Sequence, residues 1–257
     1  MLRNKVKQAL KDDKPVFGTG LTGPIEMPVL RTLANCGVEW LFLDIEHGST
    51  DISDLLNAVQ VADLLGMVSV LRIPDLQYHW VARSLDTGAL GVMIPRVETK
   101  EQAELAVQWA KFPPVGVRGM GSPSVLGYAP ISAAEALEIS NRETMVLVQI
   151  ETKKAVDNVE AIASVPGVDV LFIGPLDLSI SLGRPGDVAS EESHRAFRKV
   201  CRVARERGVA VGIVCMPEHI KTYYDMGVRL FSVGYFLYYI QTGVATAAAA
   251  FKRQVAE

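Results

Sequence analysis

Residues 40–73 read WLFLDIEHGSTDISDLLNAVQVADLLGMVSVLRI, and this stretch contains the unit that decides the fold. The segments 40–46 and 68–73 are short, apolar and rich in β-branched or aromatic residues, as buried strands are. In segment 52–66 between them, apolar residues recur every three or four positions, which is the period of an amphipathic helix. This order predicts a βαβ unit with parallel strands.

The same alternation continues along the chain. Further apolar runs lie at 15–20, 91–95, 145–151, 168–174, 209–215 and 228–234. Eight strands that alternate with helices in 257 residues predict an α/β fold, a single (β/α)8 TIM barrel. Glycines follow the helical stretches, where a left-handed C-terminal residue belongs, at Gly37, Gly66, Gly88, Gly167, Gly208 and Gly227. No linker or shift in composition divides the chain, so residues 1–257 are predicted to form one domain.

The composition excludes several classes of protein. With 26 Lys and Arg against 29 Asp and Glu, the chain lacks the basic character of a protein that binds nucleic acid or an anionic membrane. Its 49% hydrophobic and 21% charged residues allow a large core. The three cysteines form no CxxC pair, which argues against a disulfide scaffold or structural zinc. With no apolar secretory segment at the N-terminus, a cytoplasmic protein is expected.

One uncharged stretch, Leu230–Phe251, has to be weighed as a membrane span. It contains several polar residues and glycines and an alanine run, whereas membrane helices consist mainly of large aliphatic residues. We therefore predict a short strand followed by an amphipathic helix, and no membrane partner. The apolar run 236–240 is typical of an interface, so a homo-oligomer is expected.

Residues 18–23 spell GxGxxG after a strand, and Asp44 follows 21 residues beyond Gly23, as in a dinucleotide-binding fingerprint. Pro24, directly after the third glycine, suggests that the next helix begins there rather than at the glycine. A doubly wound sheet also leaves eight evenly spaced strands unexplained. We predict no nucleotide cofactor, and interpret the segment as the first βα loop at the barrel mouth.

The longest irregular stretch is 113–130, between the fourth and fifth predicted strands. Loops of this length in compact domains are usually functional, and we expect this one to be so.

Polar residues stand where the predicted strands end, which in a barrel is the catalytic face. They are found in DIEHG (44–48), at Arg72, in QIET (149–152) and in GPLDLS (174–179). An arginine inside an apolar run needs a buried anion. Taken singly, Asp177 has an alternative as a helix cap, Glu151 as a first-turn acid and His47 as a structural histidine.

Together these residues indicate a metal site. Glu151 and Asp177 end adjacent strands without a cysteine or a second histidine nearby in sequence, which suits a hard cation such as Mg²⁺ or Mn²⁺. Two protein ligands leave positions open for substrate. None of the predicted strands contains a lysine, so no Schiff-base lysine is expected. Lys153 and Lys154 lie beyond a strand end and are predicted to be solvated.

DIEHG (44–48), LRIP (71–74), VQIET (148–152) and FIGPLDLS (172–179), in this order and spacing, resemble the HpcH/HpaI family of class II pyruvate aldolases. The likeness runs from about the first helix to the last. It implies a barrel of the phosphoenolpyruvate/pyruvate-binding superfamily. It also implies a hexamer, or trimer of dimers, in which the C-terminal helix at 236–257 packs on a neighbouring subunit.

The resemblance implies a reaction and a role for each site residue. The reaction is cleavage of a 4-hydroxy-2-oxo acid to pyruvate and an aldehyde through an enolate that a divalent metal (Mg²⁺, Mn²⁺ or Co²⁺) stabilises. Glu151 and Asp177 match the metal ligands, His47 the base, and Arg72 the arginine that stabilises the transition state. Asp86 matches the carboxylate that raises the basicity of the histidine. The substrate-binding positions are Gln149 and the backbone of Gly174, Pro175, Leu176 and Asp177.

The chain departs from the family pattern at Leu176, at Leu21 in the first βα segment, and at Tyr235 after the eighth strand. An arginine expected within residues 119–129 is not evident. These departures concern the aldehyde half of the site, so the aldehyde stays open.

Two alternative functions remain. One is a citrate-lyase-like acyl-CoA lyase, which needs basic groups for the CoA phosphates, with Arg96 and Arg118 as candidates. The other is a non-catalytic 2-oxo-acid-binding protein, against which His47 argues.

Overall fold

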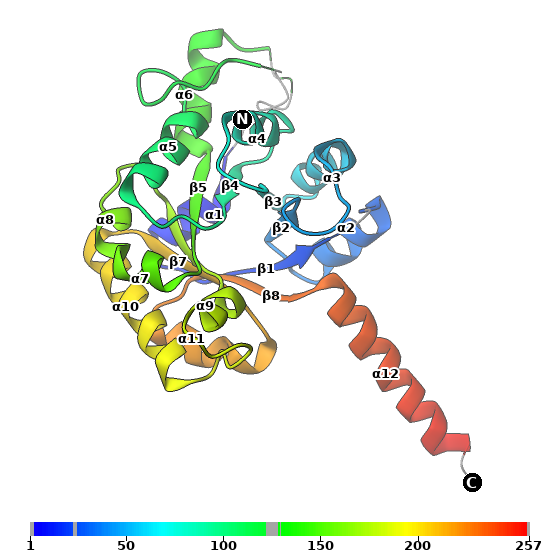
Figure 1. Ribbon diagram of the computed structural model, residues 1–257. Coiled ribbons are helices and arrows are strands. Elements are labelled where there is room, and N and C mark those ends of the chain that lie inside the picture. The colour runs from blue at the N-terminus through cyan, green and yellow to red at the C-terminus, as the bar shows by residue number, and fades with distance from the viewer. Residues whose placement is uncertain (1–2, 23–24, 122–127, 129, 256–257) are drawn as a thin grey trace.

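Eight parallel strands close into a barrel in the computed structural model, which describes residues 3–22, 25–121, 128 and 130–255 (Figure 1). The strands are β1 (Val16–Leu21), β2 (Trp40–Asp44), β3 (Val68–Arg72), β4 (Gly91–Ile94), β5 (Met145–Ile150), β6 (Val170–Ile173), β7 (Ala210–Cys215) and β8 (Leu230–Tyr235). Each strand pairs with the next along the chain, and β8 pairs with β1, so the sheet has no free edge. The predicted (β/α)8 barrel is confirmed.

Helices follow the strands around the outside of the barrel (Figure 1). They are α1 (Lys5–Lys11), α2 (Met27–Asn35), α3 (Ile52–Leu64), α4 (Tyr78–Asp86), α5 (Lys100–Ala110), α6 (Ala133–Glu143), α7 (Lys153–Asp157), α8 (Val159–Ala163), α9 (Pro175–Ser181), α10 (Glu191–Arg207), the 3-10 turn η2 (Pro217–His219), α11 (Ile220–Met226) and α12 (Phe236–Val255). Capping boxes begin α3 and α5, at Asp51 and Thr99. The six glycines predicted at helix ends all have positive φ, between 67° and 113°, as expected.

Side chains on the inner face of the barrel form a core of their own. It includes Trp40 and Phe42 of β2, Leu147 of β5 and Phe172 of β6. The aromatic rings meet edge to face, with Phe172 contacting Trp40 at 6.2 Å and Phe42 at 6.0 Å between ring centroids. The larger core lies between the outer face of the sheet and the helices. The barrel is therefore filled by side chains and is not a pore.

The glycine-rich segment belongs to the strand rather than to a loop. Gly18, Gly20 and Leu21 lie within β1, so the expectation of a first βα loop is wrong for these residues. A Cβ on Gly18 would lie 2.3 Å from the ring of Trp40. The glycine makes room for this ring inside the barrel. Gly23 and Pro24 lie outside the described residues.

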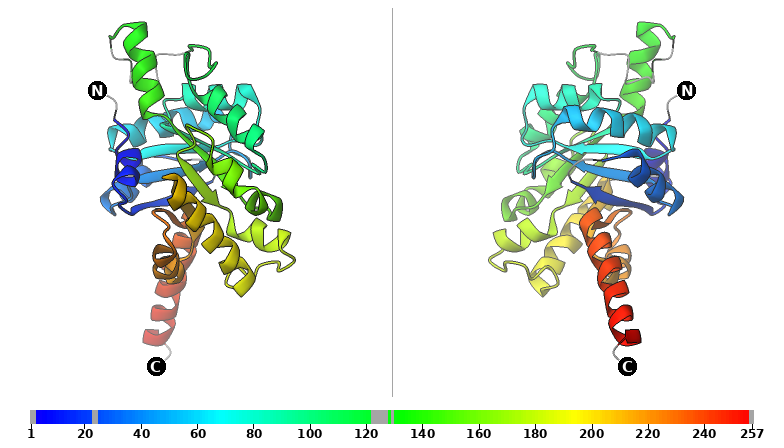
Figure 2. Two further views of the ribbon diagram at one scale, coloured as in Figure 1. Left: turned by 90° about the vertical axis from the view of Figure 1, so that its left-hand side faces the viewer. Right: turned by 90° about the vertical axis from the view of Figure 1, so that its right-hand side faces the viewer.

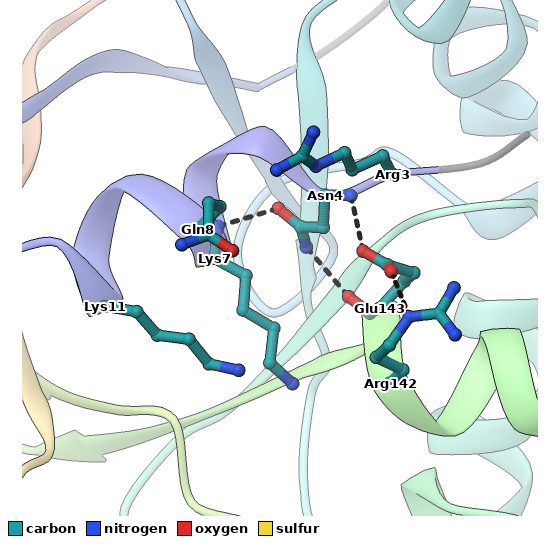
Figure 3. Close-up of a pocket in the computed structure, with 7 residues that line it drawn as sticks. All are labelled: Arg3, Asn4, Lys7, Gln8, Lys11, Arg142 and Glu143. Carbon is teal, nitrogen blue, oxygen red and sulfur yellow. Dashed lines mark hydrogen bonds and ion pairs between the residues drawn. The ribbon is translucent and has the colours of Figure 1, made fainter.

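Helix α1 closes the end of the barrel opposite the mouth, where Val6 joins the inner core. Figure 3 shows Asn4, which caps this helix, beside the end of α6. The Asn4 side chain donates to the carbonyl oxygens of Leu90 and Glu143, at 3.2 and 2.9 Å, and its backbone N–H donates to the Glu143 carboxylate. These contacts tie the N-terminal residues to the barrel.

A buried lysine supports the same end of the barrel. The Lys111 ammonium donates to the carbonyl oxygens of Asn141 and Thr144, and Lys7 donates to the Thr144 oxygen as well. Burial, with the charge of Lys7 nearby, lowers the pKa of Lys111 to about 7.

The long segment 113–130 follows a helix, not a strand. Its described part is joined to the C-terminal end of α5, because Val117 and Arg118 donate backbone hydrogen bonds to the carbonyl oxygens of Gln108 and Lys111. Helices of a barrel run back from the mouth, so this part leaves from the end away from the strand termini that carry the site. Residues 122–127 and 129 lie outside the described residues.

Helix α12 extends away from the barrel, as Figures 1 and 2 both show. None of its described side chains is buried. Exposed apolar side chains share one face of this helix at Leu237, Ile240, Val244, Phe251 and Val255. In the part of the chain that the structure describes, no helix combines the length and the apolar character needed to cross a membrane.

Candidate functional site

The inner face of the barrel changes from apolar to polar at the C-terminal ends of the strands. Because side chains alternate along a strand, the positions that follow the core residues by two point the same way. Phe42 is followed by Asp44, Val70 by Arg72, and Leu147 by Gln149. The aromatic and aliphatic layer is thus the floor of a polar site at the mouth.

Arg72 is held by two carboxylates from the neighbouring strand. Asp44 lies opposite Arg72 in the pairing of β2 and β3, and accepts from its Nε at 2.9 Å and from its Nη2 at 2.6 Å. Glu46 lies 3.2 Å from the same Nε, and the guanidinium stacks on the Phe42 ring at 4.9 Å. The buried anion that the sequence predicted for Arg72 is therefore Asp44, with Glu46 beside it.

Glu151 is buried between the ends of β4 and β6. One carboxylate oxygen accepts from the Arg96 backbone N–H at 2.8 Å, and the other from the Gln149 amide at 2.7 Å. A Cβ on Gly174 would lie 2.6 Å from Glu151 Oε2, so only glycine permits this close approach of the β6 backbone. The Gln149 Oε1 atom is buried and has no hydrogen-bond partner among the described residues. A buried acceptor without a partner is costly, so this oxygen is free to bind a hydrogen-bond donor or a cation.

A cleft of about 220 Å³ opens above this carboxylate. Its lining contains Glu46, His47, Arg96, Glu151, Thr152, Asp177, Ile180 and Ser181. His47 is 65% exposed, and its Nε2 lies 3.9 Å from Glu46 Oε2. Asp177 lies in the first turn of α9, whose N-cap is Gly174, so it is not the cap of this helix. The structure brings His47, Glu151 and Asp177 together around one cleft.

The positions 174–177, which the family resemblance predicts to bind substrate, form the start of α9. Gly174 and Pro175 lead into the helix, and the first backbone bond of its ladder runs from the Leu178 N–H to the Gly174 oxygen. The Leu176 side chain is 56% exposed. Of the other departures from the family pattern, Leu21 is buried in the core and Tyr235 is exposed at the mouth end of β8.

The predicted residue Asp86 has a different setting. It is the last residue of α4, and its carboxylate accepts from Arg118 at 2.7 Å, whereas the carboxylate that lies 3.9 Å from His47 Nε2 is that of Glu46. Arg118 is 2% exposed and stacks over Phe112 at 4.7 Å. Burial lowers the pKa of Arg118, and the Asp86 carboxylate opposes this effect. Arg118 is thus an internal group and is not available to bind CoA phosphates.

Charge is concentrated in the cleft. Burial raises the pKa of Glu151 to about 7, and the carboxylates of Glu46 and Asp177 add to the effect. Burial also raises the pKa of Glu46, against the opposing charge of Arg72. For Arg72, burial acts to lower the pKa, but hydrogen bonding to Asp44 and the charges of Asp44 and Glu46 outweigh it and raise the pKa. The carboxylates of Glu46, Glu151 and Asp177 therefore repel one another, and a cation bound among them would reduce this repulsion.

The residues present fit a divalent cation, although the described residues contain no cluster of three His, Cys, Asp or Glu side chains arranged as ligands. Glu151 and Asp177 supply hard oxygen donors, and the unpartnered Gln149 oxygen belongs to the side chain that donates to Glu151. Two carboxylates suit an ion that keeps positions for substrate oxygens. Lys153 and Lys154 form ion pairs with Asp157 and Glu98 and are more than half exposed, as predicted for residues outside the site.

The comparison with known sequences decides the family. The sequence model of the HpcH/HpaI aldolase/citrate lyase family matches residues 26–237, which run from the start of α2 to the start of α12. The chain belongs to this family. The HpcH/HpaI resemblance seen in the four sequence motifs is confirmed, and with it the assignment of the chain as a class II aldolase.

Relatives agree over most of the chain. The 5-keto-4-deoxy-D-glucarate aldolase of Klebsiella pneumoniae is 34% identical over 256 residues, covering 97% of both proteins. The 4-hydroxy-4-methyl-2-oxoglutarate aldolase of Chaetomium globosum is 38% identical over 189 residues, covering 72% of this chain and 70% of the relative. The crystal structure of an HpcH/HpaI aldolase from Desulfitobacterium hafniense superimposes with a TM-score of 0.91 at 31% identity, covering 96% of each chain.

Three residues of this HpcH/HpaI site were not assigned a role from sequence. Asp44 and Glu46 stand in the quoted DIEHG motif, and the signal that locates them is their two-residue spacing after the inner-face residue Phe42. Arg96 follows β4 and was considered only for CoA phosphates. The backbone conformation of Arg96, which positions its N–H against Glu151, could not be predicted from the local sequence.

Proposed function

We propose that the protein cleaves a 4-hydroxy-2-oxo acid to pyruvate and an aldehyde with the help of a divalent cation. The observation that carries the proposal is the buried Glu151 carboxylate at the mouth, with the unpartnered Gln149 oxygen beside it and Arg72 at the end of β3. Such a site fits a 2-oxo acid, whose carboxylate is anionic and whose carboxylate and ketone oxygens can chelate a cation together.

Glu151 and Asp177 would hold the cation, which is Mg²⁺, Mn²⁺ or Co²⁺. When bound, it supplies positive charge beside the 2-oxo-acid oxygens and so favours the enolate over the ketone. Gln149 and the backbone from Gly174 to Asp177 orient the carboxylate end of the substrate. The close approach of the Gly174 backbone to Glu151 keeps these two parts of the site together.

Arg72 and His47 act on opposite ends of the bond that breaks. His47 accepts the proton of the C4 hydroxyl, the C3–C4 bond breaks, and its electron pair passes into the pyruvate enolate. Arg72, preorganised by Asp44, stabilises the negative charge that develops on the enolate oxygen. Protonation of C3 then completes pyruvate.

Within one chain, the carboxylate that lies near His47 is that of Glu46, with Oε2 at 3.9 Å from Nε2. The role that the resemblance gives to Asp86 requires its carboxylate to act while paired with Arg118, or to reach His47 from a second copy of the chain. It therefore stays a prediction.

We also propose that the protein works as a cytoplasmic homo-oligomer, a hexamer or trimer of dimers, in which α12 packs on a neighbouring subunit. A helix of 20 residues with a continuous apolar face and no buried side chain in its own chain needs a partner surface. The chain 1–257 otherwise forms one barrel domain.

The test is pyruvate release from a panel of 4-hydroxy-2-oxo acids, with and without added Mg²⁺, Mn²⁺ or Co²⁺. We expect metal-dependent release that a chelator abolishes, and no inactivation by borohydride in the presence of pyruvate. A lysine adduct trapped by borohydride contradicts the mechanism. Tight binding of 2-oxo acids without turnover of any panel member identifies a non-catalytic binding protein instead. Turnover of acyl-CoA substrates alone supports the acyl-CoA lyase.

A further inference from the structure

Arg96 occupies an unusual position at the mouth of the barrel. It lies two residues beyond the end of β4, and its backbone is in the left-handed region with φ 50°. A side chain other than glycine rarely adopts this conformation, and where it does the strain often serves a site. Here the conformation directs the Arg96 N–H to Glu151 Oε1, at 2.8 Å.

The same residue places a cation at the entrance of the cleft. The Arg96 guanidinium is 62% exposed and donates from Nη2 to Glu46 Oε1 at 2.9 Å. A guanidinium carries five N–H donors in a planar fork, so this contact leaves an edge for a second acceptor. Glu46 also keeps its contact with Arg72, so it retains a partner if Arg96 turns toward a ligand.

The two arginines of the site have different surroundings. Arg72 is at the floor, where Asp44 occupies its fork from one side and Phe42 covers its face. Among the described residues that line the cleft, no arginine or lysine is present besides Arg96. Its side chain is exposed, so it lies where the cleft meets solvent. The part of a substrate that extends from the 2-oxo acid toward solvent therefore meets Arg96.

We propose that Arg96 binds a carboxylate on the aldehyde half of the substrate and thereby sets the preference of this chain for anionic over neutral aldehydes. This inference rests on the proposed function, since it assigns a residue of the same site to the aldehyde half of the substrate. It assigns Arg96 a specificity-determining role that is separate from the orientation of Glu151 by its backbone.

The experiment measures aldol addition of pyruvate to two aldehydes of the same shape. One is 4-oxobutanoate, which is anionic, and the other is 4-methylpentanal, in which an isopropyl group replaces the carboxylate. The quantity compared is the ratio of kcat/KM for the two acceptors, in the wild type, Arg96→Gln, Arg96→Lys and the control Arg202→Gln. Arg202 is a matched control because it is 58% exposed and lies on α10, outside the cleft.

We expect the wild type and Arg202→Gln to prefer the anionic aldehyde. Arg96→Gln should lower the ratio about tenfold, mainly through the KM for 4-oxobutanoate, because a charge-assisted hydrogen bond is lost. Arg96→Lys should keep part of the preference. Rising salt should lower the wild-type ratio, because the charge is exposed; this measurement needs no variant and covers the case in which Arg96→Gln fails to fold.

The outcomes separate this inference from the proposed function. If the wild type adds pyruvate to neither aldehyde with any metal, the proposed function itself is contradicted. If both aldehydes react and the ratio is the same in the wild type and Arg96→Gln, or insensitive to salt, the proposed function stands and the role of Arg96 is wrong. A parallel loss for both acceptors shows that Arg96 serves the pyruvate half instead, which also overturns the inference.

Discussion

Asp44 and Arg72 are partners in the pairing of β2 and β3, and the Asp44 carboxylate accepts two hydrogen bonds from the Arg72 guanidinium, at 2.9 and 2.6 Å. The register of the two strands therefore places these residues opposite each other, and their opposite charges hold them together. Because the fork is held on one side, Arg72 presents its remaining donors in a defined direction.

Arg72→Ala should therefore suppress both cleavage and exchange of the pyruvate methyl protons with solvent, by about 10²- to 10³-fold. Arg72→Lys should recover little, since an ammonium lacks the planar fork. NMR in deuterated water measures the exchange without any aldehyde present. Full exchange in Arg72→Ala places Arg72 away from the enolate oxygen and shows that our assignment is wrong.

Glu151→Gln and Asp177→Asn should each weaken Mn²⁺ binding by more than about 100-fold, because changes in the groups around metal ligands already cost 10- to 100-fold. Each substitution removes a charge but little volume, so the circular dichroism spectrum should not change. Glu160→Gln on the surface of α8 is the control and should bind Mn²⁺ as the wild type does. Unchanged binding in both site variants, measured by calorimetry, excludes this pair as the ligands.

Asp86→Asn should lower the free energy of unfolding by about 1–3 kcal/mol, because it leaves the buried Arg118 guanidinium without its anionic partner. The control Asp157→Asn removes an exposed pair with Lys153 and should leave the stability close to that of the wild type. Denaturant unfolding measures both. If Asp86→Asn keeps wild-type stability but shifts the pH dependence of cleavage, its role lies in catalysis, as the family resemblance implies.

Lys111 makes stability depend on pH. With a pKa of about 7 in the folded chain and an ordinary value near 10.4 when unfolded, the unfolded chain binds more protons between these values. Its contribution to stability therefore rises with pH across this window, by a few kcal/mol at most. Lys111→Met should flatten the rise, although it also deprives Asn141 and Thr144 of a donor. Parallel pH–stability curves for the two proteins contradict a neutral Lys111.

Leu237→Glu and Val244→Glu should each dissociate the oligomer, because they place a charge on the apolar face of α12. The control Thr246→Glu lies about half a turn away from this face and should leave the assembly intact. Light scattering coupled to size-exclusion chromatography measures the mass. A wild-type monomer contradicts the proposed assembly.

The sequence predicted the barrel well because its evidence is local. Runs such as 145–151 identify buried strands, and glycines such as Gly208 mark helix ends where φ is 67°. The polar ends of the strands also met as predicted, since closure of the barrel brings every C-terminal strand end to one face. His47, Arg72, Glu151 and Asp177 all lie there.

The misses depend on contacts between distant parts of the chain. Gly18 was expected in the first βα loop, but it lies within β1, where its lack of a side chain makes room for the ring of Trp40, 22 residues later. The pairing of Asp86 with Arg118 joins α4 to the segment after α5, and no local pattern predicts it. The functional role expected of segment 113–130 stays a prediction, and what the sequence did not predict is the attachment of its described part to the end of α5.

The closure of the barrel by α1 has a kinetic consequence. With Val6 at the far end and aromatic side chains filling the interior, both products must leave through the mouth by which the substrate entered. In the proposed reaction, pyruvate is held at Glu151 and Gln149, beneath the aldehyde that forms near His47 and Arg96. We therefore expect ordered release, in which the aldehyde departs first and pyruvate last.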